Sequence, residues 1–228
     1  RQAADAFAEV EKLQRWDGPM NLARVYNVEG RIDEAVAALQ RAQTFADHEG
    51  FPRWTWAWLS GVANRQQGRL VEAVQNLRSV LEDSTADMQA RGFDFSLDYE
   101  VINLLGQTWF DIGRLRQRQG RDDEAAEAWK QAIETFQKTL KIDSENVTAH
   151  YNLQLLYDEV GEKDLAREHE RLHQRYKVDD NAKGRAVRLA RERYPAANHA
   201  AEAVVIYDLQ RPGAPGLELA DDQQASDR

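Results

Sequence analysis

The chain has 228 residues, of which 42% are hydrophobic, 30% are charged and none is cysteine, and its formal net charge is −9 at pH 7. The absence of cysteine excludes disulfides, thiolate metal ligands, a cysteine nucleophile and covalently attached haem within these residues. The acidic charge argues against a nucleic-acid partner. Because no run of about 18 apolar residues is present, no membrane partner is predicted either.

The opening residues predict one helix. Ala3, Phe7 and Val10 share one face at helical spacing. Two interpretations stay open for this helix. It is either the second helix of a repeat whose first helix precedes residue 1, in a fragment of a longer protein, or a lone capping helix.

Four short turns separate the apolar segments that follow. Each turn has a glycine followed five residues later by an alanine, and each lies between stretches in which apolar residues recur every three or four positions. The pairs are Gly30 and Ala35, Gly68 and Ala73, Gly120 and Ala125, and Gly161 and Ala166. This recurrence predicts helix–turn–helix units that bury their remaining faces by stacking on one another.

Three tryptophans open the second unit. Trp54, Trp56 and Trp58 follow Pro52, a residue suited to the first turn of a helix. A step of two residues rotates a helix by about 200°, so the three rings cannot share one face. Packing between helices is the favoured role, and a ligand anchor is the alternative for Trp54 or Trp58.

An insertion separates the second unit from the third. Within residues 82–105, Gly92 and its polar neighbours interrupt the helical period. We predict a loop from Gly92 to Ser96, followed by a long helix that is capped by Ser96 or Asp98 and continues to Gln119. A spacer is favoured over a functional lid.

The sequence HERLH in the fourth unit matches the pattern of zinc peptidases. In that pattern two histidines one turn apart, here His169 and His173, bind zinc, and the glutamate between them, here Glu170, acts as general base. Glu192 is the nearest candidate for a third ligand, with His199 behind it. Zinc binding and hydrolysis are therefore alternatives, but we favour a terminal repeat with relaxed core positions and predict no catalytic residue, no metal and no cofactor.

The last part of the chain is predicted to cover the end of the repeat array, which occupies residues 1–175. Residues 176–210 contain apolar segments that can form capping helices. The β-branched run from Val204 to Tyr207 leaves helix and strand open. Residues 211–228, with glycine, proline and then polar residues, predict a mobile tail.

The third unit resembles the tetratricopeptide repeat family, because Trp109, Gly113, Ala125 and Ala132 stand in the order of that family's bulky, small and alanine positions. Aligned in this way, the repeats start at Trp16, Trp54, Gly106 and Val147. The starts are further apart than the family's usual spacing of about 34 residues. The resemblance implies an all-α right-handed solenoid of about four helix pairs with a C-terminal capping segment, and a non-catalytic protein-interaction scaffold. It also favours a fragment of a longer protein.

In that family the first helices of the repeats line an inner groove. The resemblance places ten residues in this groove: Asn21, Arg24, Asn27, Trp58, Arg65, Phe110, Arg114, Arg118, Tyr151 and Asn152. Arginine binds carboxylates with two parallel hydrogen bonds, and amides can hold a peptide backbone, so the expected partner is a protein or peptide with acidic groups or a C-terminal carboxylate. The alternative is that the arginines pair with acids of neighbouring helices, such as Asp111 or Glu159.

A second resemblance concerns the stretch from Tyr176 to Pro215, which contains PAANHAAEAVVIYDL. It resembles the end of bacterial proteins in which such repeats follow a multihaem c-type cytochrome domain. This implies a periplasmic location and an accessory role, in which the repeats dock on another domain of their own parent chain. A cytoplasmic location is the alternative, and no functional residue is carried over.

Overall fold

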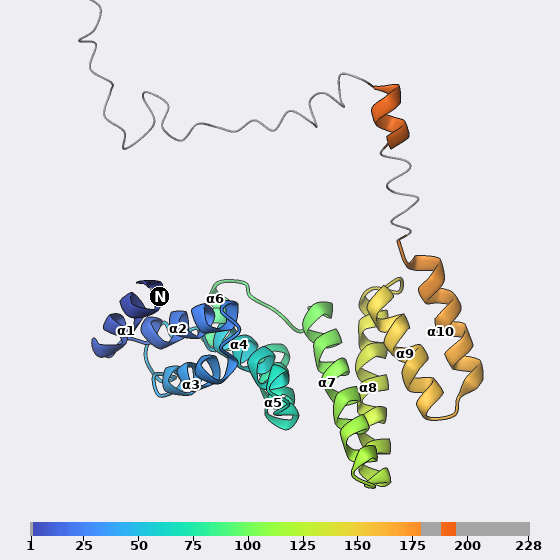
Figure 1. Ribbon diagram of the computed structural model, residues 1–228, viewed down its shortest axis with the longest axis horizontal. Helices are drawn as coiled ribbons and strands as arrows, with labels where there is room; N and C mark the ends of the chain where they lie inside the picture. The colour runs from blue at the N-terminus through green and yellow to red at the C-terminus, as the bar shows by residue number, and fades with distance from the viewer. Residues whose placement is uncertain (1, 179–187, 195–228) are drawn as a thin grey trace, which may run out of the picture. The chain divides into compact units, whose positions relative to one another are not determined.

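The computed structural model describes residues 2–178 and 188–194. The chain divides into two units, Arg1–Lys177 and Val178–Arg228. The described part of the first unit contains ten helices and no strand. Their bounds are α1 Gln2–Lys12, α2 Asp17–Val28, α3 Ile32–Gln43, α4 Arg53–Gln66, α5 Leu70–Glu82, α6 Ala86–Ala90, α7 Tyr99–Arg118, α8 Asp122–Ile142, α9 Val147–Glu159 and α10 Lys163–Tyr176 (Figure 1).

Eight of these helices form the four predicted pairs: α2 with α3, α4 with α5, α7 with α8, and α9 with α10. The turn of each pair contains its predicted glycine at a positive φ, between 71° and 83°, where any other residue is strained. After Gly120, the amide of Arg121 donates to the carbonyl oxygen of Arg116 at 3.0 Å and satisfies the end of α7. The alanines that follow the turns are all buried, so the repeated signature is confirmed in both of its parts.

Buried apolar side chains run along the whole first unit in three clusters. One joins α1 to α4, the next joins α4, α5, α7 and α8, and the last joins α7 to α10. Trp56 packs against the first and second clusters, and Trp109 against the second and third. Each pair therefore buries its remaining face on its neighbour, as a stacked solenoid requires.

The three tryptophans of α4 take different packing roles. The Nε1–H of Trp56 donates to the backbone oxygen of Leu39 at 2.8 Å and ties α4 to α3. Trp58 packs against the cluster of α4, α5, α7 and α8. Trp54 contacts two phenylalanines of the insertion, Phe93 and Phe95. The favoured prediction, packing between helices, is confirmed for Trp56 and Trp58, whereas Trp54 packs against the insertion.

The insertion between α5 and α7 contains the short helix α6 and then residues without regular structure (Figure 1). The predicted loop from Gly92 to Ser96 is confirmed. Asp98 is the residue that caps α7, because its Oδ1 accepts hydrogen bonds from the amides of Glu100 at 3.0 Å and Val101 at 3.2 Å. The helix α6 was not predicted.

The described residues include the N-terminal helix α1 but only a short helix in the second unit. At the N-terminus, α1 packs on α2, and Glu11 of α1 pairs with Arg41 of α3, which suits both interpretations of the opening helix. In the second unit, residues 188–193 are helical. Most of the remaining predicted capping segment, including Val204 to Tyr207, and the tail from residue 211 lie outside the described residues, so the two predicted domain boundaries stay predictions.

Candidate functional site

The first helices of the four pairs, α2, α4, α7 and α9, succeed one another along the unit. Contacts join α2 to α4 and α7 to α9, and an ion pair joins α4 to α7. We use the name first-helix face for the accessible residues at the predicted groove positions together with Asp111 and Glu159, two acidic residues that lie among them. Its members are Asn21, Arg24, Asn27, Trp58, Arg65, Asp111, Arg114, Arg118, Tyr151 and Glu159.

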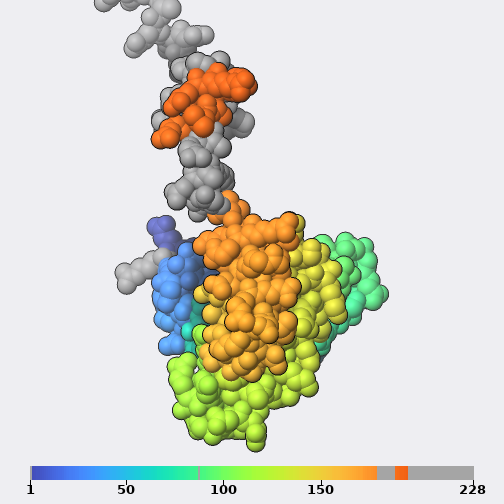
Figure 2. All heavy atoms as spheres, turned by 90° about the vertical axis from the view of Figure 1, so that its right-hand side faces the viewer, coloured from blue at the N-terminus to red at the C-terminus, as the bar shows by residue number. Residues whose placement is uncertain are grey.

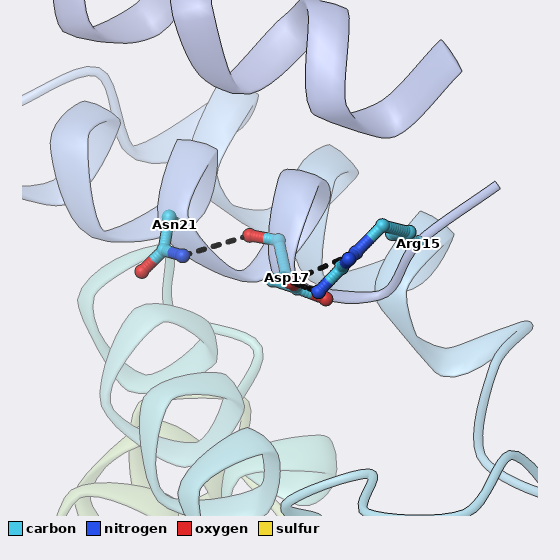
Figure 3. A network of polar contacts seen from close by, with 3 residues as sticks. All are labelled: Arg15, Asp17 and Asn21. Atoms are coloured by element: carbon cyan, nitrogen blue, oxygen red, sulfur yellow. Dashed lines mark hydrogen bonds and ion pairs between the residues drawn. The ribbon is translucent and has the colours of Figure 1, made fainter. Parts of the chain in front are cut away.

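At the start of this face, both the nitrogen and the oxygen of the Asn21 side-chain amide form hydrogen bonds with residues of α2. Its Nδ2 donates to the backbone oxygen of Asp17 at 2.9 Å, and the carboxylate of Asp17 accepts from Arg15 at 2.6 Å (Figure 3). The Oδ1 of Asn21 accepts from Arg24 at 3.3 Å. Asn21 therefore orients the exposed Arg24 and is less available as the amide clamp that we predicted.

Asn27 and Arg65 occupy the same position in consecutive repeats. The Oδ1 of Asn27 and the Nε of Arg65 are buried and have no hydrogen-bond partner among the described residues. The Nη2 of Arg65 donates to the carboxylate of Asp111 at 2.8 Å. This arginine therefore links α4 to α7, as the alternative interpretation required.

The guanidinium of Arg114 is held between an aromatic ring and an acid. It lies 4.1 Å above the ring of Phe110, and its Nη2 is 3.9 Å from the carboxylate of Glu159, at the limit of an ion pair. Arg118, one turn further along α7, is exposed, and its Nε donates to the backbone oxygen of Arg114 at 3.3 Å. Within the described residues Arg118 has no acidic partner, so these two cations are available to a ligand.

Two of the ten predicted groove residues are buried and cannot meet a ligand. Phe110 is 3% exposed and belongs to the core of α7 to α10, because its ring packs inward beneath Arg114. Asn152 is 7% exposed, and its Nδ2 donates to the backbone oxygen of Thr148 at 2.8 Å. Tyr151, in contrast, is exposed and contacts only one ring, that of His173.

The histidines of HERLH both turn toward α9. The Nδ1 of His169 is 2.9 Å from the Nδ1 of His150, and the Nδ1 of His173 donates to the backbone oxygen of Val147 at 3.2 Å. Glu192 belongs to the second unit. Among the described residues, no group of three or more histidine, aspartate or glutamate side chains is arranged to hold a metal ion.

The contact between His150 and His169 depends on one proton. The Nε2 of His150 lies 3.1 Å from the carbonyl oxygen of Ser144, which can only accept, so Nε2 carries the proton of His150. The Nδ1 of His150 then accepts from the Nδ1–H of His169. Tyr176 stacks on His150 and Tyr157 stacks on His169, so both imidazoles are packed between α9 and α10.

We expect the stability of the chain to fall as the pH is lowered through the range where His169 titrates in the unfolded state. Burial, and then the charge of His150, lower the pKa of His169 below its ordinary value of 6.5, with Glu168 acting in the opposite direction. The unfolded chain therefore binds this proton first, and stability present above about pH 6.5 is lost below it. Melting temperatures measured by circular dichroism between about pH 7.5 and pH 5 test this.

The control for this measurement is a histidine outside the contact. His169→Gln should flatten the dependence of the melting temperature on pH, whereas His48→Gln, at an exposed position, should leave it unchanged. Equal slopes for the parent chain and His169→Gln would show that this contact does not govern the pH response.

Sequence reasoning missed one surface. The insertion was interpreted as a spacer, yet its aromatic residues are held against Trp54 and partly exposed. A signal was present, because apolar residues alternate with polar ones, of which three are acidic and one is Ser96, from Phe93 to Glu100.

Comparison with known proteins supports the repeat assignment over part of the chain and the fold over most of it. Residues 110–179 match the family model described as tetratricopeptide repeat. In one crystal structure of MamA, the aligned region spans 80% of this chain and 89% of the MamA chain, with 16% sequence identity and a TM-score of 0.55. In another, the aligned region spans 76% of this chain and 80% of the MamA chain, with 16% sequence identity and a TM-score of 0.57. No curated protein matches the chain.

These comparisons confirm the resemblance to tetratricopeptide repeats and the all-α solenoid fold. At such low identity the likeness to MamA concerns the fold alone. They give no support to the second resemblance, to cytochrome-linked repeat regions. Within the described residues, no helix is both long and apolar enough to cross a membrane.

Proposed function

We propose that this chain is a non-catalytic scaffold that binds an extended, carboxylate-bearing segment of a partner protein on its first-helix face. A solenoid of helix pairs commonly serves protein interaction, which supports the general role. The choice of ligand rests on one observation, the pair of cations Arg114 and Arg118 one turn apart on α7.

The surroundings of these arginines favour a carboxylate ligand. Arg114 is fixed in place by the ring of Phe110, which lowers the entropy lost on binding. Its ion pair with Glu159 is long, at 3.9 Å, so its hydrogen-bonding capacity is not used up. Arg65 is excluded from this proposal, because Asp111 already occupies it.

A labelled acidic peptide tests the proposal directly. The probe is a fluorescein-labelled peptide in which glutamate alternates with glycine and the C-terminus is a free carboxylate, and the readout is fluorescence anisotropy. Replacing Arg114 and Arg118 together by alanine should weaken binding about tenfold. The effect is no larger because both side chains are solvent-accessible, so water and salt screen their charges. The same change should make the dissociation constant less sensitive to salt.

The matched control places the same double change on a second helix. Arg167 and Arg171 have the same spacing on α10 and are exposed, so Arg167→Ala with Arg171→Ala alters the net charge equally. This variant should bind the peptide as the parent chain does. If both double variants bind with the parent affinity, the ligand site is not on the first-helix face.

A further inference from the structure

The insertion between α5 and α7 holds an aromatic cluster that is separate from the first-helix face. The ring of Trp54 has its centroid 5.6 Å from that of Phe93 and 5.2 Å from that of Phe95. The amide of Phe93 also donates to the backbone oxygen of the buried Met88 at 2.8 Å. The insertion is thereby anchored to α4 and α6, so its outward side chains keep a defined arrangement.

Several of these outward side chains are apolar. Phe93, Leu97 and Tyr99 are 37%, 65% and 42% exposed. A single exposed hydrophobic residue is ordinary, but three such residues within one short segment are characteristic of an interaction surface. In Figure 2 this segment belongs to the green edge of the unit, at the right of the view.

Acidic residues are interspersed with the apolar ones. They are Glu82, Asp83, Asp94, Asp98 and Glu100. None of them has an ion-pair partner among the side chains that the structure describes, whereas acids of nearby helices do: Glu72 pairs with Arg69, and Asp111 with Arg65. Residues 82–100 hold six acidic residues and one basic residue, Arg91, so this stretch carries a net negative charge that a cationic partner would relieve.

A hollow of about 490 Å³ lies against the insertion. It is lined by Leu81, Glu82, Asp83, Ser84, Met88, Gln89, Gly92, Phe93, Asp94, Phe95 and Ser96. Among the described residues that line it, none is lysine or arginine. Hydrogen bonds from Ser96 lower the pKa of Asp94, so this carboxylate stays charged at neutral pH. The hollow combines an apolar wall with negative charge, which suits a ligand that is apolar and cationic at once.

We propose that the insertion surface docks a basic segment of a partner protein in which arginine or lysine alternates with apolar residues. We define the insertion surface as Glu82, Asp83, Phe93, Asp94, Leu97, Tyr99 and Glu100. The apolar side chains of the partner cover the exposed rings and Leu97, and its cations meet the carboxylates between them. A short segment that carries both kinds of side chain can supply both kinds of contact.

This surface is complementary to a different ligand from the one proposed for the first-helix face. There, arginines select carboxylates; here, carboxylates select cations, so the two surfaces can hold different partners on one chain. A nucleic acid is excluded as the occupant because its phosphates would meet unpaired carboxylates. The proposal does not depend on the function proposed above.

The test uses the whole chain and a synthetic probe. The probe is a short fluorescein-labelled peptide in which arginine alternates with leucine, and two control peptides replace the arginines by glutamine or the leucines by glycine. Fluorescence anisotropy should show saturable binding of the first peptide that weakens with salt. Both control peptides should bind at least tenfold more weakly, because each lacks one of the two kinds of contact.

The variants combine one apolar and one acidic change at exposed positions. Asp94→Asn with Leu97→Ser should weaken binding of the arginine–leucine peptide at least tenfold. The matched control, Val28→Ser with Asp123→Asn, replaces one aliphatic residue by serine and one aspartate by asparagine at exposed positions of α2 and α8 and should bind as the parent chain does. The single variant Asp94→Asn should also weaken binding of this peptide, and it disturbs the loop less than the double variant does.

Three outcomes would overturn the proposal. They are no saturable binding of the arginine–leucine peptide to the parent chain, equal affinity of the insertion variants and the matched control, and equal affinity of the arginine and glutamine peptides. Arg114→Ala with Arg118→Ala should leave this binding unchanged, which separates it from binding on the first-helix face.

Discussion

Replacing Phe136 by alanine is expected to lower the free energy of unfolding of the chain by about 3 to 5 kcal/mol. The side chain is fully buried, at 0% exposed, in the cluster that joins α7 to α10. Its ring lies directly against Gly106 of α7: a Cβ added at Gly106 would be 2.8 Å from Cζ of the ring. Removing the ring leaves a cavity between two long helices that cannot close without moving α7.

Urea unfolding followed by circular dichroism measures this effect. Ile142→Ala is the control, because Ile142 lies on the same helix but is partly exposed, and its loss should be well under half as large. A second check uses Gly106→Ala, which should destabilise the parent chain and cost much less in the Phe136→Ala background, where the ring is gone. A loss below about 1 kcal/mol for Phe136→Ala would contradict the packing described here.

The parts of the fold that could be predicted are those determined by residues close together in the sequence. A helix turn that needs a positive φ calls for glycine, so Gly68 and Gly120 mark the turns wherever the chain folds. The alanines five residues later, such as Ala73 and Ala125, are small because the facing helix approaches closely there. The cap at Asp98 is likewise a contact between near neighbours in sequence.

Contacts between distant residues were not predictable in this way. The buried amide of Asn103 donates to Asn146 at 3.1 Å and its oxygen accepts from Thr139 at 2.9 Å, although these residues lie on different helices or at their ends. Such a network depends on how α7, α8 and α9 cross, which residue spacing alone does not specify.

The candidate site shows the same division. The family resemblance placed Phe110 and Arg114 together on α7, and both do lie together. Which of them is buried depends on the angle at which α7 packs on its neighbours, so Phe110 turned out to be core and Arg114 surface. The arrangement of the aromatic residues of the insertion was likewise not predictable, because it depends on packing against Trp54, which is distant in the sequence.

The second large effect is expected from Gly113→Ala. A Cβ at this position would overlap Nε1 and Cδ1 of the buried Trp129 on α8, so the indole or the helix must shift. Alanine is a better helix former than glycine by about 1 kcal/mol, but overpacking a rigid ring costs about 1 to 3 kcal/mol and more where the ring cannot turn. Because Trp129 is enclosed by the core of α7 to α10, we expect the cost of the overlap to exceed the gain in helix propensity. The free energy of unfolding should fall by about 2 kcal/mol.

The sign of this effect is tested by removing the ring. In a Trp129→Ala background both overlapping atoms, Nε1 and Cδ1, are absent, so Gly113→Ala should become neutral or stabilising, because only the gain in helix propensity remains. Urea unfolding of the four chains in this cycle should give a coupling energy above about 1 kcal/mol. Gly113 also precedes Arg114, so a shift of α7 in the single variant should weaken binding of the acidic peptide. If Gly113→Ala is equally harmful in both backgrounds, then a contact other than the one with Trp129 sets the distance between α7 and α8.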